Sequence, residues 1–223
     1  MQGKFITFEG GEGTGKSTHA AMLAHRLESL GLGVLLTREP GGSPGAEAIR
    51  HVLLSGAAKP FGPDAEAMLF AAARDDHVNC SILPALAAGK WVVCDRFADS
   101  TRVYQGVLGK IDRRLIRALE RVSIGALSPD LTFVLDVPAA LGQERAARRR
   151  GTSNPDRFEA EENEFHENLR QAYLALAASE PDRCVIVDAS AAKDDVAKRI
   201  WATVNSRLNP AMAPLVFEKT LAS

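Results

Sequence analysis

A ten-residue stretch, EGGEGTGKST at positions 9–18, constrains the fold of this chain more than any other feature. It matches the pattern G-x-x-x-x-G-K-S, an apolar run of strand type precedes it, and a helical pattern follows it. In such a loop the glycines let the backbone curl until several N–H groups point inward, and the helix adds the positive end of its dipole. The sequence therefore predicts a strand, a phosphate-binding loop and a helix.

The chemistry expected of this loop depends on a few side chains. Lys16 can place its ammonium between the outer phosphates of a nucleotide, and the Ser17 hydroxyl can bind Mg²⁺. The third predicted strand ends in Asp95, followed by Arg96. Asp95 can hold the Mg²⁺, and the guanidinium of Arg96 can donate two hydrogen bonds to one phosphate. We expect the nucleotide to bind along the whole loop, which comprises Gly10, Gly11, Glu12, Gly13, Thr14, Gly15, Lys16, Ser17 and Thr18.

Simpler interpretations of the same residues stay open. The loop could be a tight glycine-rich turn with an incidental lysine, and Asp95 with Arg96 could form an ion pair at the end of a strand. Moreover, GTPases, ATPases and nucleotide kinases share such a loop, so the loop does not identify the substrate. The guanine-reading motif N-K-x-D of GTPases is absent from the sequence, which argues against that class.

Short apolar runs alternate with helical patterns along the chain. The expected strands are residues 4–8, 33–37, 91–95, 131–136 and 184–188, and the expected helices are residues 16–30, 64–89 with a break at Pro84, 113–127, 139–150, 159–179 and 193–208. Nearly continuous hydrophobicity suits strands that are buried on both faces. The alternation predicts an α/β fold with a five-stranded, doubly wound parallel sheet and helices on both faces. We expect one domain over residues 1–210 and a separate tail over 211–223.

Composition limits the classes of function. The net charge of −1 argues against a dominant nucleic-acid-binding surface. Cys80, Cys94 and Cys184 lie in apolar surroundings without metal-ligand spacing, so we expect them to pack in the core of a protein from a reducing compartment. The start of the sequence lacks a signal-peptide pattern, and no apolar run approaches the ~18 residues of a membrane span. These features favour a cytoplasmic protein with no membrane partner.

Several motifs occur in one order along the chain: FEGGEGTGKST at 8–18, TREPGG at 37–42, LFAAARDDH at 69–77, DRFADSTRVYQG at 95–106, ERAARRRG at 144–151 and DRFE at 156–159. In this order they resemble the thymidylate kinase family, and the resemblance is closest to its bacterial type. It extends over roughly residues 4–190. TREPGG and DRFADSTRVYQG are much more specific than the phosphate loop. Val103 departs from the family, which commonly has alanine there.

The resemblance implies a P-loop kinase fold and an enzyme that phosphorylates dTMP to dTDP with ATP and Mg²⁺. Phe70 and Arg74 lie four residues apart on one helix face, where the resemblance has them stack on thymine and donate to its carbonyl. It also implies that Arg38 and Arg96 clamp the acceptor phosphate and that Glu12 receives a hydrogen bond from the sugar 3′-OH. Base and sugar would further contact Ser100, Thr101, Tyr104 and Gln105.

A mobile lid over about residues 144–158 is also implied by the resemblance. Arg145, Arg148 and Arg149 share one helix face beside Arg150, and one or more of them would reach the transferred phosphoryl group. Adenine would lie near residues 189–193. The alternative is a solvated basic helix end that complements the helix dipole. The expected catalytic residues are thus Lys16, Asp95, Arg96, Arg148 and Arg149, with Ser17 and Asp95 as metal ligands.

The family further implies a homodimer, for which the helix that carries Phe70 and Arg74 is a candidate interface. Three other functions stay open on the sequence alone. The chain could be a kinase for another nucleoside monophosphate, a P-loop nucleotide sensor without phosphoryl transfer, or a nucleic-acid-binding protein that uses the lid arginines. The near-neutral charge argues against the last of these.

Overall fold

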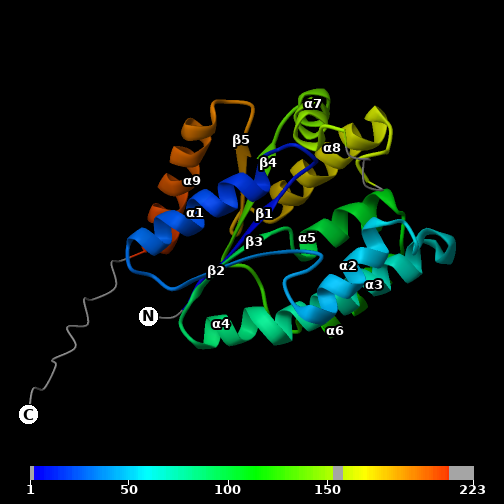
Figure 1. The fold of residues 1–223 in the computed structure, drawn as a ribbon, viewed down its shortest axis with the longest axis horizontal. Helices are drawn as coiled ribbons and strands as arrows, with labels where there is room; N and C mark the ends of the chain where they lie inside the picture. Colours follow the sequence, from blue (N-terminus) through cyan, green and yellow to red (C-terminus); the bar gives the residue numbers. More distant parts are fainter. Residues whose placement is uncertain (1–2, 153–157, 211–223) are drawn as a thin grey trace, which may run out of the picture.

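A computed structural model of the chain describes residues 3–152 and 158–210. Its centre is a sheet of parallel strands in the order β2-β3-β1-β4-β5 (Figure 1). The strands are β1 Phe5–Glu9, β2 Val34–Arg38, β3 Trp91–Asp95, β4 Leu131–Asp136 and β5 Cys184–Asp188. The predicted five-stranded parallel sheet is therefore confirmed.

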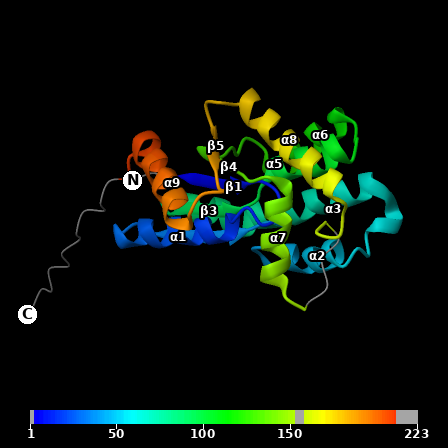
Figure 2. The ribbon, with the colours of Figure 1, turned by 90° about the horizontal axis from the view of Figure 1, so that it is seen from above.

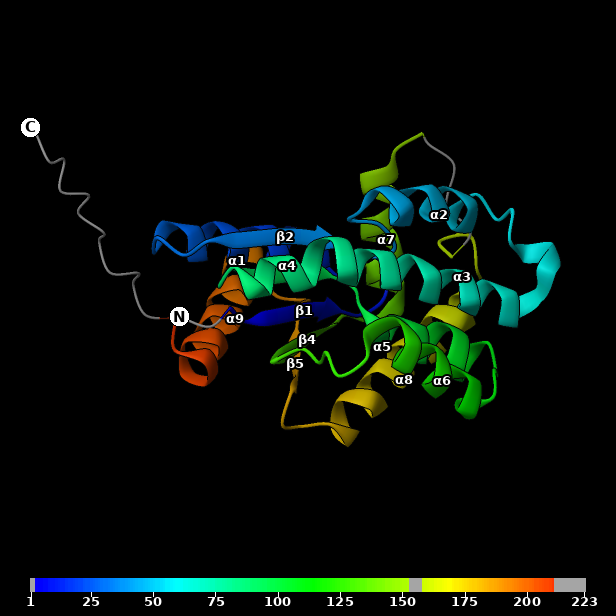
Figure 3. The same ribbon diagram turned by 90° about the horizontal axis from the view of Figure 1, so that it is seen from below.

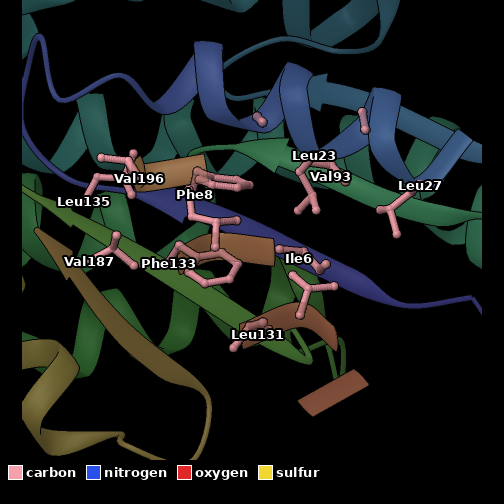
Figure 4. Close-up of a cluster of buried hydrophobic side chains, with 14 of the residues drawn as sticks. Ile6, Phe8, Leu23, Leu27, Val93, Leu131, Phe133, Leu135, Val187 and Val196 are labelled. Atoms are coloured by element: carbon pink, nitrogen blue, oxygen red, sulfur yellow. The ribbon is translucent and has the colours of Figure 1, made fainter. Parts of the chain in front are cut away.

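Helices cover both faces of the sheet because its central strands are apolar on both sides. Side chains alternate along a strand, so Ile6 and Phe8 of β1 face α1 (Lys16–Ser29) and α9 (Lys193–Leu208). Figure 4 shows this cluster, with Leu23 and Leu27 of α1 packed toward the strands. Phe5 faces the other layer and packs with Val92 and Phe97. By the same alternation Glu9, the last residue of β1, belongs to this second layer.

The second layer, on the Phe5 side of the sheet, contains most of the other helices. They are α2 (Pro44–Leu54), α3 (Gly62–His77), α4 (Leu83–Ala87), α5 (Ala98–Thr101), α6 (Arg113–Ile124) and α8 (Asn163–Ser179). In Figure 3 the arrowheads of β1 and β2 point toward α2 and toward α7 (Ala139–Arg150). Figure 2 shows α2, α3 and α7 beyond the strand ends. A site formed at these ends can thus draw residues from many elements.

The long helix expected over residues 64–89 is divided, as its proline suggested. A π-helical turn, η2 (Val78–Ile82), separates α3 from α4 just before Pro84. Pro84 has no N–H to donate to the carbonyl one turn earlier, which explains why the regular helix is interrupted there. A second π-helical segment, η3 (Arg102–Leu108), continues α5.

Other differences from the expected elements are local. Helix α2 was not expected, because its sequence begins in the glycine- and proline-rich segment EPGGSPG; a short 3₁₀ turn, η1 (Lys59–Phe61), follows it. Helix α8 begins at Asn163 rather than at residue 159, and α6 ends at Ile124 rather than at residue 127. The expectation that Cys80 packs in the core is wrong: it is exposed on η2, where its Sγ lies 3.5 Å from Asp76 Oδ1.

The remaining expectations about the fold concern few residues. Cys94 and Cys184 are buried as expected, and both are free thiols. Within residues 3–152 and 158–210, no helix is both long and apolar enough to cross a lipid bilayer. The expected tail at 211–223 and part of the expected lid, 153–157, lie outside the described residues.

Candidate active site

A cavity of about 280 Å³ opens at the carboxyl ends of β1, β2 and β3. The side chains expected to bind an acceptor nucleotide all line it: Glu12, Arg38, Phe70, Arg74, Arg96, Ser100, Thr101, Tyr104 and Gln105. Lys16, Ser17 and Asp95 line the same cavity, and so does Arg149 from the end of α7. The fold therefore brings residues from widely separated parts of the sequence to one place.

The predicted phosphate loop has the expected geometry between β1 and α1. Gly10, Gly13 and Gly15 have φ angles of 132°, 67° and 92°, a region that favours glycine. At Gly13 an added Cβ would lie 1.9 Å from the carbonyl oxygen of Gly142, so the loop also packs closely on α7. Of the loop residues, Lys16 and Ser17 line the large cavity, and Gly10, Gly11 and Thr14 line a smaller one beside α7 and α8. Glu12 lines both.

Lys16 is folded back onto the loop. Its Nζ donates to the carbonyl oxygen of Gly11 at 2.6 Å. Burial and the nearby positive charge of Arg96 lower the pKa of Lys16 to about 8. An anion bound in the loop would offset both effects, because it would add negative charge to that of Glu12 and Asp95 beside the buried ammonium.

The residues expected to bind a divalent cation meet at the mouth of the loop. The Ser17 hydroxyl donates to Asp95 Oδ2, and Asp95 Oδ1 is buried with no hydrogen-bond partner among the described residues. An unpartnered carboxylate oxygen beside a hydroxyl fits the oxygen ligands that Mg²⁺ prefers. Among the described residues, here included, no cluster of three or more His, Cys, Asp or Glu side chains could hold a metal ion. A cation here would therefore need further oxygen ligands, such as those of nucleotide phosphates.

Arg96 occupies the centre of the site in a strained backbone conformation, with a φ of 69°. One end of its guanidinium, Nη1, donates to the carbonyl oxygen of Gly10 at 3.0 Å, to Tyr173 Oη at 3.2 Å and to Ser100 Oγ at 3.3 Å. The other end, Nη2, pairs with Glu12. Arg96 is thus held on one side by the protein interior and faces the cavity on the other.

Glu12 is an acidic residue inside a phosphate-binding loop, and its ion pair with Arg96 explains why an acid is tolerated there. Although burial opposes its ionisation, the positive charges of Arg96, Lys16 and Arg149 lower the pKa of Glu12 to about 2. Tyr104 also donates to Glu12, at 3.3 Å. Glu12 is therefore an ionised counter-charge for Arg96, and it lines the large cavity together with it.

Glu9, directly before the loop, is completely buried. Its Oε1 accepts from the backbone N–H of Phe97 at 2.7 Å, and its Oε2 accepts from Ser100 Oγ at 2.7 Å and from Tyr173 Oη at 3.0 Å. Burial and the negative charge of Asp99 raise the pKa of Glu9 from 4.5 to about 7, against the opposing charge of Arg96. The carboxyl group of Glu9 therefore contacts Ser100 and Tyr173, the two side chains that accept hydrogen bonds from Arg96 Nη1.

Arg74 forms part of a buried polar wall. Its Nε donates to Glu39 Oε2 at 2.8 Å, and its Nη2 donates to Thr101 Oγ1 at 3.0 Å. The other oxygen of Glu39 lies 3.1 Å from Nδ1 of His77. Glu39 therefore fixes the orientation of Arg74 before any ligand binds.

The apolar wall of the cavity is aromatic. The Phe70 ring lies 6.3 Å from that of Phe158, which in turn lies 5.1 Å from the ring of Tyr104 in an edge-on arrangement. Gln105 is buried and donates to Glu66 Oε1 at 3.3 Å. Aromatic faces beside fixed polar groups are typical of a pocket that binds a flat heterocycle.

The arginines of α7 point in different directions. Arg149 lines the cavity and pairs with Glu159 at 2.8 Å, whereas Arg148 is mostly exposed and pairs with Glu144 on its own helix. Arg150 also pairs with Glu159, at 3.0 Å. Arg145 donates to the carbonyl oxygens of Ala189 and Ser190, at 2.8 and 3.2 Å, in the loop where adenine is expected.

Sequence patterns did not identify several residues of this site. In the sequence, Glu9 lies between the expected first strand and the phosphate loop, and Tyr173 lies within an expected helix. Phe158 is one residue of the DRFE motif. Glu9 and Tyr173 are separated by more than 160 positions, so no local spacing connects them. The signal that could have identified Glu9 is an acidic residue in an otherwise apolar strand directly before a phosphate loop.

The parallel sheet, the phosphate loop at the end of β1 and the Ser17–Asp95 pair define a P-loop nucleotide-binding protein. Residues 8–200 match the family model described as "Thymidylate kinase". Thymidylate kinase of Nitrobacter winogradskyi is 61% identical over 207 residues, which cover 93% of this chain and 90% of the relative. That of Bradyrhizobium diazoefficiens is 58% identical over 215 residues, or 96% and 94% of the two chains. The chain belongs to the thymidylate kinase family.

A solved structure supports the same assignment at the level of the fold. The crystal structure of thymidylate kinase from Ehrlichia chaffeensis superposes with a TM-score of 0.73 at 31% sequence identity. The match covers 92% of this chain and 99% of that one. The similarity therefore extends over nearly the whole of both molecules.

The raised pKa of Glu9 predicts a specific dependence of stability on pH. The folded protein holds this proton up to a pH of about 7 and the unfolded chain only to about 4.5, so the stabilisation is complete below 4.5 and is lost as the pH rises to 7. The loss is about 3 kcal/mol. Denaturant unfolding of the wild type and of Glu9→Gln across this range should show it as a falling difference in free energy between them. A difference that stays constant would contradict the prediction.

Proposed function

We propose that this protein transfers the γ-phosphoryl group of ATP to dTMP, giving dTDP and ADP, with Mg²⁺ bound beside the phosphates. The observation that carries the proposal is the single cavity in which the phosphate loop, Arg96 and the aromatic wall meet. Membership of the thymidylate kinase family supports it independently. The two lines agree on a reaction that joins two nucleotides end to end.

The aromatic wall is suited to select the acceptor base. We propose that thymine lies against Phe70, with Phe158 and Tyr104 closing the pocket around it. Arg74 is buried and already bonded to Glu39, so its orientation costs no further entropy when it donates to a ring carbonyl. Thr101 and Gln105 complete the polar edge of this pocket.

The acceptor phosphate would bind where Arg96 now meets Glu12. Arg96 presents its Nη2 end there, and Arg38 lines the same cavity with a partly exposed side chain. In exchange, Glu12 would accept a hydrogen bond from the 3′-OH of the sugar. Ser100 and Tyr104 lie beside this position. The exchange would keep each charge paired, which matters because an unpaired buried charge is costly.

The donor would bind through the loop from Gly10 to Thr18, with Lys16 at its outer phosphates and adenine near the loop that follows β5. Arg145 already contacts that loop from α7, which supports this placement. Ser17 and Asp95 would hold the cation, which neutralises phosphate charge when bound. No protein group needs to form a covalent bond.

The chemical step is an in-line displacement at phosphorus. An oxygen of the acceptor phosphate forms a bond to the γ-phosphorus of ATP, and the bond between that phosphorus and the bridging oxygen of ADP breaks. The protein positions the two phosphates and stabilises the charge on the transferred group through Lys16, Arg96 and Arg149. Arg149 can leave Glu159 without isolating it, because Arg150 pairs with the same carboxylate.

We also propose a homodimer that uses the outer face of α2, α3 and η1. Large apolar side chains are exposed there, including Phe61, Met68 and Val52. Exposed apolar side chains on neighbouring elements are typical of a protein–protein interface. A cytoplasmic location agrees with this assignment and with the substrates proposed.

A coupled assay of ADP release tests the substrate directly. With ATP and Mg²⁺ present, we expect kcat/KM for dTMP to exceed that for dCMP, AMP and GMP by at least about tenfold, because the other bases lack the fit to the aromatic wall. A preference for another monophosphate would replace dTMP in the proposal. Binding of ATP without ADP release in the presence of any monophosphate would indicate a sensor and would refute the proposed reaction.

The two arginines at the end of α7 predict contrasting variants. We expect Arg149→Ala to lower kcat by about 10³-fold with a smaller change in the KM for dTMP, because the lost contact is made to the transferred group. We expect Arg148→Ala to change kcat less than about tenfold, since Arg148 pairs with Glu144 on the outer side of the helix.

Steady-state kinetics with Arg117→Ala as the control separates this effect from a general loss of positive charge. Arg117 is an exposed arginine of α6 that does not line the cavity. An unchanged kcat for Arg149→Ala would contradict the role proposed for it. A large loss for Arg148→Ala alone would transfer that role to Arg148.

A further inference from the structure

The anchored end of Arg96 depends on three oxygen atoms that also contact one another. Arg96 Nη1 donates to Ser100 Oγ and to Tyr173 Oη, and these two hydroxyl oxygens lie 2.9 Å apart. Both lie within 3.0 Å of Glu9 Oε2. Strand β1, helix α5 and helix α8 thus each supply one oxygen to the space behind the arginine.

The protons in this cluster have a defined direction when Glu9 is ionised. A carboxylate can only accept, so the hydroxyl protons of Ser100 and Tyr173 turn toward it, directly or through one another. The lone pairs of both hydroxyls are then free to accept from Arg96. Glu9 therefore sets the direction of the hydroxyl protons in two of the groups that hold the guanidinium, Ser100 and Tyr173.

No neutral side chain of the same shape can replace Glu9 without a conflict. Its Oε1 accepts from the N–H of Phe97 and its Oε2 from the hydroxyl pair. A glutamine must therefore turn its NH₂ group toward a backbone donor or toward the two hydroxyls. In the second orientation a hydroxyl proton loses its acceptor and competes with Arg96 for the same lone pairs.

We propose that Glu9 is a positioning residue, which acts through Ser100 and Tyr173 to hold Arg96 in the orientation that receives the phosphate of the acceptor nucleotide. We refer to Glu9, Ser100 and Tyr173 as the Glu9 relay. The inference rests on the proposed function, because that function places the acceptor phosphate at Arg96. It goes further by assigning part of the specificity for the phosphate to Glu9 and Tyr173, which do not line the large cavity.

A purely structural role for Glu9 makes a different prediction. Glu9 also accepts the N–H of Phe97 at the start of α5, so its loss could distort the helix that carries Ser100 and Thr101. Such a distortion would weaken the binding of the nucleoside part of the acceptor. Glu9 and Tyr173 do not line the large cavity and reach the ligand through Ser100 and Arg96, so the relay should mainly affect a ligand that carries a phosphate.

Equilibrium binding of dTMP and of thymidine, by titration calorimetry at about pH 8.5 so that Glu9 is ionised, separates the two roles. We expect Glu9→Gln to weaken the binding of dTMP by at least about tenfold and that of thymidine by less than about twofold. Thr7→Val is the matched control, since Thr7 is a buried polar residue of the same strand and bonds to Thr132 instead. It should change neither affinity by more than about twofold.

Tyr173→Phe provides a second variant that keeps the ring in the core. It should weaken dTMP several-fold more than thymidine, and combining it with Glu9→Gln should give less than the product of the two effects, because both act through one relay. If Glu9→Gln does not fold, the preference of the Tyr173→Phe loss for dTMP decides alone. Equal losses for both ligands, or no loss for either, would overturn the proposal.

The same titrations distinguish failure of the relay from failure of the proposed function. They require no turnover, and the monophosphate that the wild type binds best, with its own nucleoside, can replace dTMP and thymidine if another base is preferred. A wild type that binds a monophosphate no more tightly than its nucleoside would overturn the relay and the proposed function together. A phosphate-specific loss in a wild type without kinase activity would support the relay and refute only the reaction.

Discussion

The pairing of arginine with glutamate around one cavity is the interaction on which the rest of this site depends. Arg96 pairs with Glu12, Arg74 with Glu39, and Arg149 with Glu159. Without such partners, these positive charges would repel one another at the end of the sheet. The pairs keep the arginines in place before a ligand binds. A phosphate that binds can then take the place of a carboxylate at an arginine, so the charge of that arginine is paired both before and after binding.

The parallel sheet makes these pairs possible. The last residues of β1, β2 and β3 are Glu9, Arg38 and Asp95, so three charged side chains come together from distant parts of the sequence. Charged residues are excluded from the apolar middle of the strands, and the strand ends are the first positions where they are tolerated. The same edge then supplies a buried carboxylate behind Arg96 and a carboxylate for a cation in front of it.

Patterns within short segments predicted the strands and most of the helices, and the resemblance of the motifs indicated most of the residues of the cavity wall. Strand-type runs located all five strands to within one residue, because buried strands are apolar and contiguous. Helix α2 was missed because its first residues are glycines and prolines that usually mark turns. Motif resemblance, rather than periodicity, indicated Phe70 and Tyr104, which spacing alone would equally assign to a core or a helix surface.

The partners of the site residues could not be predicted in the same way. The contacts of Arg74 with Glu39 and of Tyr173 with Glu9 join positions far apart in the chain, and they depend on how helices pack on the sheet. The directions of Arg148 and Arg149 depend on the rotation of α7, which the run of arginines does not fix. Tertiary packing therefore decides which of several identical side chains faces the ligand.

A crystal structure of the protein with dTMP bound would test the central claim most directly. The account predicts that the phosphate replaces Glu12 at Arg96 Nη2, that Arg96 Nη1 keeps its bonds to Ser100 and Tyr173, and that thymine lies against Phe70. A phosphate bound elsewhere, with the pair between Arg96 and Glu12 intact, would contradict it.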